Sequence, residues 1–334
     1  MTYLEQLAKQ AVHVEEGGPV SRFTASTVGR LNPNSIPALL MSGRTYVDPS
    51  RTAIFIKDED KIKKHREEAE GIAKYDPEAL KDTVVRLGGT NVIDDLLWKK
   101  NRGEDDPWHK RIGGRVFQNK KTGLISKVLG VPNTLVSSAI MPLLRGSHYN
   151  PYSDAIAEFS DEPAILQHEL GHALDFNRLY GIRPGSKDDG LLKRQLKGLA
   201  RDLYGLSYFG VPGGFLLHEA RANQLSHAAL KKHLGANSPE YREAVKRRWE
   251  VLPVGYGSYL AGAAAPFTAG VINPVVGMAI GKGVGRVMSS ISPNGTKKQK
   301  DKNPKPKEKE EDQVSKAASV RISLNKLANL LCNR

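Results

Sequence analysis

The stretch that decides the fold is His168-Glu169-Leu170-Gly171-His172. Residues four apart lie one turn above each other on the same face of an α-helix, so His168 and His172 can direct two imidazoles at one metal ion. Glu169 lies about 100° further round such a helix, where its carboxylate can accept a proton from a metal-bound water. The spacing therefore predicts a helical zinc site with Glu169 as the catalytic residue. The competing interpretation is an ordinary surface helix that matches by chance.

The residues around this stretch favour a helix that follows a short strand. Asp161-Glu162-Pro163 is typical of a helix start, with acids in the first turn and a proline where no backbone donor is needed. Residues 164–176 contain one helix-weakening residue, Gly171, which we expect to let a neighbouring strand or a substrate approach closely. Residues 155–159 look like a short strand bounded by Asn150-Pro151 and Ser160-Asp161, and a strand edge can hold an extended peptide.

One side of the predicted helix is expected to face the core, and the other side to carry the site. The core-facing stripe consists of Leu166, Leu170, Ala173 and Leu174, and the opposite side of Ile165, His168, His172 and Asp175.

Zinc in catalytic sites usually has three protein ligands, so a third ligand is needed. Residues 215–234 predict a second helix that carries Glu219. Its neighbours Ala220 and Ala222 are small, which favours tight packing against the first helix. Asn223 follows one turn later, where it can hydrogen-bond the outer nitrogen of a ligating histidine. We therefore predict His168, His172 and Glu219 as the zinc ligands.

Two other side chains compete with Glu219 as the third ligand. His218 precedes it directly, and Asp175 lies three residues beyond His172 on the same predicted face. A straight helix rarely brings side chains from three successive turns to one tetrahedral ion, so we expect Asp175 to support the site from outside. A solvated glutamate at position 219 remains the alternative.

Together these two helices resemble the gluzincin zinc metallopeptidases, in which an H-E-x-x-H helix is followed by a glutamate ligand, often within E-x-x-A-D. The matching residues are Glu219, Ala222 and Asn223, and asparagine stands where the pattern usually has aspartate. The resemblance covers about residues 152–234. It implies an α+β fold with a zincin-like catalytic core, made of a small sheet, an active-site helix and a second ligand helix.

The predicted chemistry is peptide-bond hydrolysis by a zinc-activated water, with Glu169 as general base. Zinc lowers the pKa of its water towards about 7, and Glu169 passes the water's proton to the leaving amine. Amide bonds in small molecules would use the same residues. One protein donor should stabilise the oxyanion together with zinc. The sequence leaves its identity open among Tyr204, Tyr208, His227, Tyr241 and Tyr256.

Residues 251–292 form a glycine- and alanine-rich hydrophobic segment without any acid. Its first basic residue is Lys282, so residues 251–281 exceed the roughly 20 residues that span a bilayer. Prolines interrupt the segment, and Gly277, Gly281 and Gly285 repeat every four residues, which favours close helix packing. We expect a helical hairpin that associates with a membrane. A buried hairpin in a soluble domain is the alternative.

The remaining regions are less informative. Residues 1–130 predict a mixed α/β region with no secretory signal, including a strand at 52–56 and a charged helix at 57–70, and residues 131–250 the catalytic core. Residues 293–319 are a charged linker that we expect to be disordered. Residues 320–334 have the apolar spacing of a short amphipathic helix.

The composition indicates where the protein is located and which partners it binds. The 334 residues carry a formal net charge of +14, and basic residues flank the hydrophobic segment, which favours an anionic membrane surface beside a peptide or protein substrate. The basic residues are not interleaved with aromatic ones, and no nucleic-acid-binding module is recognised, so nucleic acid is not favoured as a partner. A single cysteine, Cys332, excludes an internal disulfide and favours the cytoplasmic side of a membrane, or else the soluble cytoplasm. A non-catalytic zincin scaffold that inserts in membranes or self-assembles is the alternative function.

Overall fold

The computed structural model describes residues 12–27, 58–98, 112–144, 146–179, 182–185, 188–210, 214–264 and 274–291. The chain divides into two compact units, residues 1–294 and residues 295–334, and the second lies outside the described residues. The predicted strand at 52–56, the charged linker and the amphipathic C-terminal helix also lie outside them. The described part mixes a small sheet with many helices, which is consistent with the predicted α+β class.

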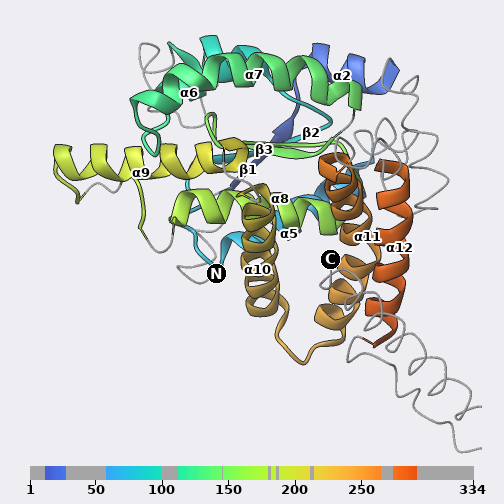
Figure 1. The fold of residues 1–334 in the computed structure, drawn as a ribbon. Helices are drawn as coiled ribbons and strands as arrows, with labels where there is room; N and C mark the ends of the chain where they lie inside the picture. The colour runs from blue at the N-terminus through green and yellow to red at the C-terminus, as the bar shows by residue number, and fades with distance from the viewer. Residues whose placement is uncertain are drawn as a thin grey trace, which may run out of the picture. The chain divides into compact units, whose positions relative to one another are not determined.

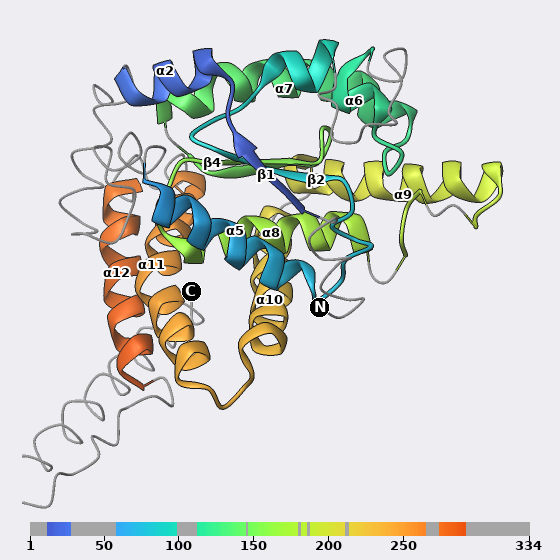
Figure 2. The ribbon, with the colours of Figure 1, turned by 180° about the vertical axis from the view of Figure 1, so that it is seen from behind.

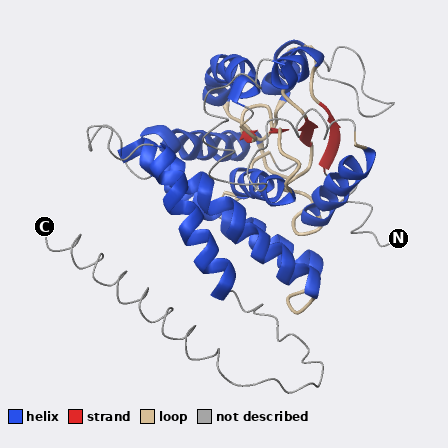
Figure 3. Cartoon of the chain, turned by 90° about the vertical axis from the view of Figure 1, so that its right-hand side faces the viewer, coloured by secondary structure: helices blue, strands red, loops and turns tan. Residues whose placement is uncertain are grey.

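A four-stranded mixed sheet lies at the centre of the first unit (Figures 1 and 3). Its strands are β1 (Val12–Glu16), β2 (Thr83–Leu87), β3 (His148–Asn150) and β4 (Ala155–Glu158), in the order β1-β2-β4-β3. β1, β2 and β4 are parallel, whereas β3 pairs antiparallel with β4. The predicted strand at 155–159 is thus confirmed as β4, but the expectation that it offers an edge to a peptide is wrong. β4 is paired on both sides, and β3 is the strand at that edge of the sheet.

Helices cover both faces of the sheet (Figures 1 and 2). On one face lie α2 (Pro19–Thr27), α6 (Gly114–Gln118) and α7 (Leu124–Leu144). On the other lie α5 (Glu59–Ala73) and α8 (Pro163–Arg178), and α10 (Gly214–Leu234) packs against both. A π-helical turn spans Ile93–Leu97, and the remaining helices are α9 (Leu191–Gly210), α11 (Pro239–Ala264) and α12 (Pro274–Ile291). The charged helix expected at 57–70 is confirmed as α5.

The main hydrophobic core lies between the sheet and the pair α5 and α8. Ile156 from β4 and Leu166 and Leu170 from α8 are completely buried in it. The predicted core-facing stripe of α8 is therefore confirmed. The opposite side of α8 is buried too, since every residue from Ala164 to Asn177 is buried. Pro163 stands at the start of the helix, as the sequence predicts. The acids expected in the first turn precede it instead, with Glu162 as the N-cap residue.

α11 and α12 pack against each other through glycines. A Cβ built on Gly257 would lie 1.9 Å from the backbone oxygen of Gly277, and one on Gly285 would lie 2.3 Å from that of Trp249. α11 begins at Pro239 and runs past residue 251, where the buried Val251 contacts Ala164 and Ile165 of α8. Among the helices that the structure describes, none is both long enough and apolar enough to cross a bilayer. Membrane association of residues 251–292 stays a prediction.

Candidate metal centre

His168, His172 and Glu219 converge on one point between α8 and α10. The Nε2 atoms of the two histidines are 3.1 Å apart. Glu219 Oε2 lies 3.0 Å from His168 Nε2, and Glu219 Oε1 lies 3.4 Å from His172 Nε2. All three side chains are buried. Within the described part of the chain, these three residues form the one cluster of histidine, cysteine and acidic side chains with the spacing of a metal site.

The spacing and chemistry of this triad fit a zinc ion. A tetrahedral zinc ion with bonds of about 2.0–2.1 Å sets its ligand atoms about 3.3 Å apart, close to the separations in the triad. Two imidazoles and one carboxylate are also a common donor set for catalytic zinc. The two rings stand edge to face, with their planes 78° apart, so both Nε2 atoms can point at one position. The residues present therefore fit the predicted metal.

Gly171 brings the two helices close enough for this convergence. A Cβ at this position would lie 2.1 Å from the backbone oxygen of Ala222 and 3.0 Å from Ser226 Cβ. The close neighbour is thus helix α10, and the expected strand or substrate is a wrong prediction. Tight packing through Ala222 is as predicted, because this residue is completely buried, but Ala220 is exposed and takes no part in the contact.

Asn223 lies where the sequence places it, with Oδ1 3.2 Å from Nδ1 of His168. The same oxygen accepts a hydrogen bond from Nη2 of Arg248, a buried residue of α11. Arg248 is held by two further acceptors, Gln167 Oε1 at 3.1 Å and Ser226 Oγ at 2.7 Å.

These contacts determine which nitrogen of His168 carries the proton. A guanidinium can only donate, so Arg248 keeps the oxygen of the Asn223 amide turned towards itself and towards His168. With a cation in the triad, Nδ1 of His168 would donate to Asn223, which would leave the lone pair of Nε2 for the ion in place of its contact with Glu219. Sequence reasoning missed Arg248, since no motif links residue 248 to residue 168.

Asp175 supports the second ligand helix and does not join the triad. Its carboxylate accepts hydrogen bonds from the hydroxyl of Tyr204 and, at 2.6 Å, from Nε of Arg221 on α10. Burial lowers the pKa of His172, but the hydrogen bond and charge of Glu219 raise it above its ordinary value, and the charge of Asp175 adds a smaller contribution. The rival ligand His218 also lies outside the triad: its Nε2 is 3.0 Å from Ser207 Oγ, and its ring stacks on Phe176.

The candidate general base, Glu169, is buried beside the triad. The pKa of Glu169 is raised to about 8, mainly by burial. The charge of His172 opposes the rise, the charge of Glu219 contributes to it, and a backbone hydrogen bond at Tyr149 also opposes it. Burial would also raise the pKa of Glu219, but the hydrogen bonds from His168 and His172 hold it far below its usual value. The ligand carboxylate, Glu219, is thus ionised, whereas the carboxyl group of Glu169 needs a positive charge nearby to ionise at neutral pH.

A second buried acid, which sequence reasoning also missed, lies at the end of β4. Burial raises the pKa of Glu158 to about 8, and the charge of Glu169 adds to the rise. Glu158 Oε1 accepts hydrogen bonds from Ser147 Oγ at 2.6 Å and from the backbone N–H of Ser160 at 2.7 Å. These two hydrogen bonds lower the pKa but do not offset burial, and Oε2 has no hydrogen-bond partner among the described residues. A single glutamate at the end of a strand has no sequence pattern that would indicate its burial or its raised pKa.

The candidate donors to an oxyanion separate into three groups. Tyr204 is buried and donates to Asp175. Tyr241 and His227 contact each other, with the phenolic oxygen 2.8 Å from Nε2 of the imidazole. The side chains of Tyr208 and Tyr256 lie outside the described residues. These contacts do not single out one side chain, so the identity of the donor stays open.

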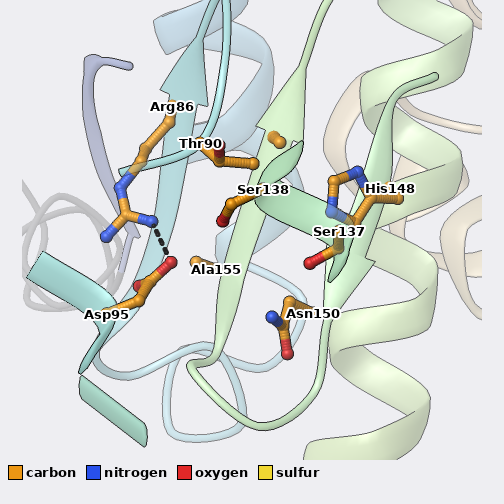
Figure 4. A pocket seen from close by; sticks show the side chains of 9 residues that line it. Arg86, Thr90, Asp95, Ser137, Ser138, His148, Asn150 and Ala155 are labelled. Atoms are coloured by element: carbon orange, nitrogen blue, oxygen red, sulfur yellow. Dashed lines mark hydrogen bonds and ion pairs between the residues drawn. The ribbon is translucent and has the colours of Figure 1, made fainter. Parts of the chain in front are cut away.

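A small polar pocket lies on the other face of the sheet (Figure 4). Ala155 and Ala157 of β4 line it, whereas the intervening Ile156 points into the core beside α8. Arg86 borders the pocket and is buried in ion pairs with Glu15, Asp94 and Asp95. The pocket contains no residue of the triad, so it belongs to a different part of the molecule.

Comparisons with protein-family models, curated proteins and solved structures found no match to this chain. The functional interpretation therefore depends on the geometry of the triad and its surroundings.

Proposed function

We propose that the chain is a zinc-dependent metallopeptidase that hydrolyses peptide bonds. The observation that carries this proposal is the convergence of His168 Nε2, His172 Nε2 and the Glu219 carboxylate, with all pairwise contacts between 3.0 and 3.4 Å. Glu169 lies one residue after the first of these ligands, as the H-E-x-x-H pattern of the gluzincin peptidases requires. A bound zinc ion would supply Lewis acidity, which polarises a carbonyl group and makes a water molecule more acidic.

In this proposal the chain's own residues orient the reactants and move the proton. His168 is held in the ligand-competent tautomer by Asn223 and Arg248. Glu169 takes a proton from the attacking water and passes it to the leaving amine. This role requires an ionised carboxylate, whereas burial raises the pKa of Glu169 to about 8. A divalent cation in the triad would lower that pKa again, so binding of the metal and activation of the base are coupled.

The sheet offers a place for the peptide. β3 is the edge strand next to β4 and contacts α8. Its backbone groups on the outer side can pair with an extended substrate, which would run along the edge nearest the helix with the histidines. Because main-chain pairing does not depend on side-chain identity, this contact favours peptides over small amides.

The Glu169→Gln variant tests this function, because glutamine keeps the shape of the side chain but cannot accept the proton. We expect the variant to keep one zinc per chain by elemental analysis and to lose at least about 100-fold in the rate of cleaving a mixture of internally quenched peptides. His172→Ala, by contrast, should lose the zinc itself. Wild-type protein that binds zinc but cleaves no faster than Glu169→Gln would contradict the peptidase and support the non-catalytic scaffold.

A further inference from the structure

A row of leucines on α9 remains exposed to solvent. Leu192, Leu196, Leu199, Leu203 and Leu206 repeat at alternating intervals of four and three residues, which places them on one face of the helix. Leu192 is 73% exposed, and Leu196 and Leu203 are each 57% exposed. Soluble proteins rarely leave such a continuous apolar stripe uncovered, and an apolar patch with a polar rim usually marks an interaction surface.

The charges around this leucine face are mostly positive. Residues 183–201 contain six Lys or Arg against two Asp. Lys193 and Arg194 are exposed and lie next to Leu192. The one acid within α9, Asp202, is buried and accepts hydrogen bonds from Ser126 of α7. Asp189, which precedes the helix, is buried and ion-paired with Lys193 and Lys197. The exposed basic side chains of α9 are therefore Arg194 and Lys193, which is paired with Asp189, whereas Arg201 is buried. No acid within the helix is exposed, and Asp188 just before it is.

The position of α9 leaves this face accessible. The first half of the helix projects past the sheet and the helices that cover it, in both views (Figures 1 and 2). The middle of the helix is anchored where Asp202 meets Ser126 and where Gly198 approaches Gly123, with 3.0 Å from a Cβ at residue 198 to the backbone nitrogen of Gly123. A rigidly anchored helix can therefore present its leucines to a partner without unfolding.

Charge decides among the possible occupants of this face. A second copy of α9 would oppose cations with cations, and residues 193 and 195, which flank the leucines, are Lys and Gln and form no complementary pair. Residues 320–334 contain Arg321, Lys326 and Arg334 without any acid, so this segment of the chain would be repelled as well. An anionic lipid surface satisfies both features, because acyl chains accept the leucines and headgroups accept the lysine and arginine side chains.

We propose that the leucine face of α9 docks on an anionic membrane surface, with Lys193 and Arg194 reaching the lipid headgroups. The helix would lie in the plane of the interface and not cross the bilayer. This docking is independent of the metal centre, so it can be measured on chelated protein and separated from the peptidase proposal.

Vesicle flotation of the full chain tests the docking. We expect wild-type protein to float with vesicles of phosphatidylcholine and phosphatidylserine, and much less with phosphatidylcholine alone. The double variant Leu196→Gln/Leu203→Gln should bind at least about tenfold more weakly, because it lacks two apolar side chains that would be buried in the lipid. The matched control is Val20→Gln/Phe23→Gln on α2, two residues that are even more exposed than Leu196 and Leu203 but belong to another helix. This control should float like the wild type.

A local probe distinguishes α9 from other membrane-binding parts of the chain. In a Cys332→Ser background, Leu196→Cys carries an environment-sensitive dye, whose emission should shift to the blue with the anionic vesicles. Flotation of the Leu196→Gln/Leu203→Gln variant at wild-type strength, or a dye signal unchanged by vesicles, would overturn the proposal. So would a concentration-dependent dimer that this double variant abolishes without any change in flotation, because a second copy would then cover the leucines.

Discussion

Replacing Gly171 by alanine tests whether the close approach of α8 and α10 holds the metal centre together. The added Cβ would lie 2.1 Å from the backbone oxygen of Ala222, whereas ordinary contact begins near 3.4 Å. The clash is with backbone, so a side-chain rotation cannot relieve it, and the helices must separate by about 1.3 Å. Glu219 lies one turn before Ala222 on α10 and would move with it. A separation of that size takes its carboxylate out of the range in which zinc binds all three ligands.

The magnitude follows from two opposing effects. Alanine is the better helix former by about 1 kcal/mol, whereas overpacking costs about 1–3 kcal/mol or more, and a backbone clash lies at the upper end. We therefore expect Gly171→Ala to lower the free energy of unfolding by about 1–2 kcal/mol and to weaken zinc binding by at least about tenfold.

Gly283 provides a matched control for this substitution. It lies within α12, and a Cβ there would meet nothing within 4 Å, so Gly283→Ala should be neutral or slightly stabilising. Zinc affinity is measured by competition with a chelator, and stability by urea denaturation of the metal-free protein. If Gly171→Ala binds zinc as tightly as Gly283→Ala does, the two helices are not held at this distance by the glycine, and the reasoning fails.

Two further predictions concern the buried polar groups around the triad. Glu158 has a pKa of about 8 in the folded chain against an ordinary value of 4.5, so the folded state keeps a proton that the unfolded state releases, and stability falls as pH rises through this window. Glu158→Gln should abolish this loss. Relative to the wild type, its free energy of unfolding in urea should be higher by up to about 4 kcal/mol at pH 8 and almost unchanged at pH 4.5. If the free energy of unfolding depends on pH equally in both proteins, the assignment is wrong. Arg248→Met frees the amide of Asn223 to rotate, so zinc affinity should fall about 10- to 100-fold, whereas Arg242→Met at an exposed site of the same helix should leave it unchanged. Equal affinity of these two variants would show that Arg248 does not act through Asn223.

Local sequence signals predicted the elements that carry the ligands. The acids and proline at 161–163 mark the start of α8, and the strand before it is visible as a short apolar run. The second helix, α10, was predicted from its helix-forming residues. Glu219 was selected within it because catalytic zinc needs a third ligand. These inferences succeeded because capping, turn formation and helix propensity act over a few residues.

Contacts between distant segments escaped prediction. β1 was not expected, because the alternation of Val12 and Val14 with His13 and Glu15 is too short to distinguish a strand. The edge position of β3 follows from its antiparallel pairing with β4, which no spacing reveals. In the same way, the partner of Gly171 proved to be Ala222, fifty-one positions away, and the exposure of the leucines on α9 depends on which neighbours fail to cover them. Periodicity identifies an apolar face, but it does not say what the face meets.

Charge balance connects these buried groups to the metal. Glu219 and Glu169 would together place two negative charges in a buried region where both neighbouring histidines are needed as neutral ligands. A divalent cation matches this charge, which is why an ionised Glu169 is compatible with the site only when the triad is loaded. Burial, with a smaller contribution from the charge of Glu169, raises the pKa of Glu158 to about 8, which favours its neutral form at neutral pH.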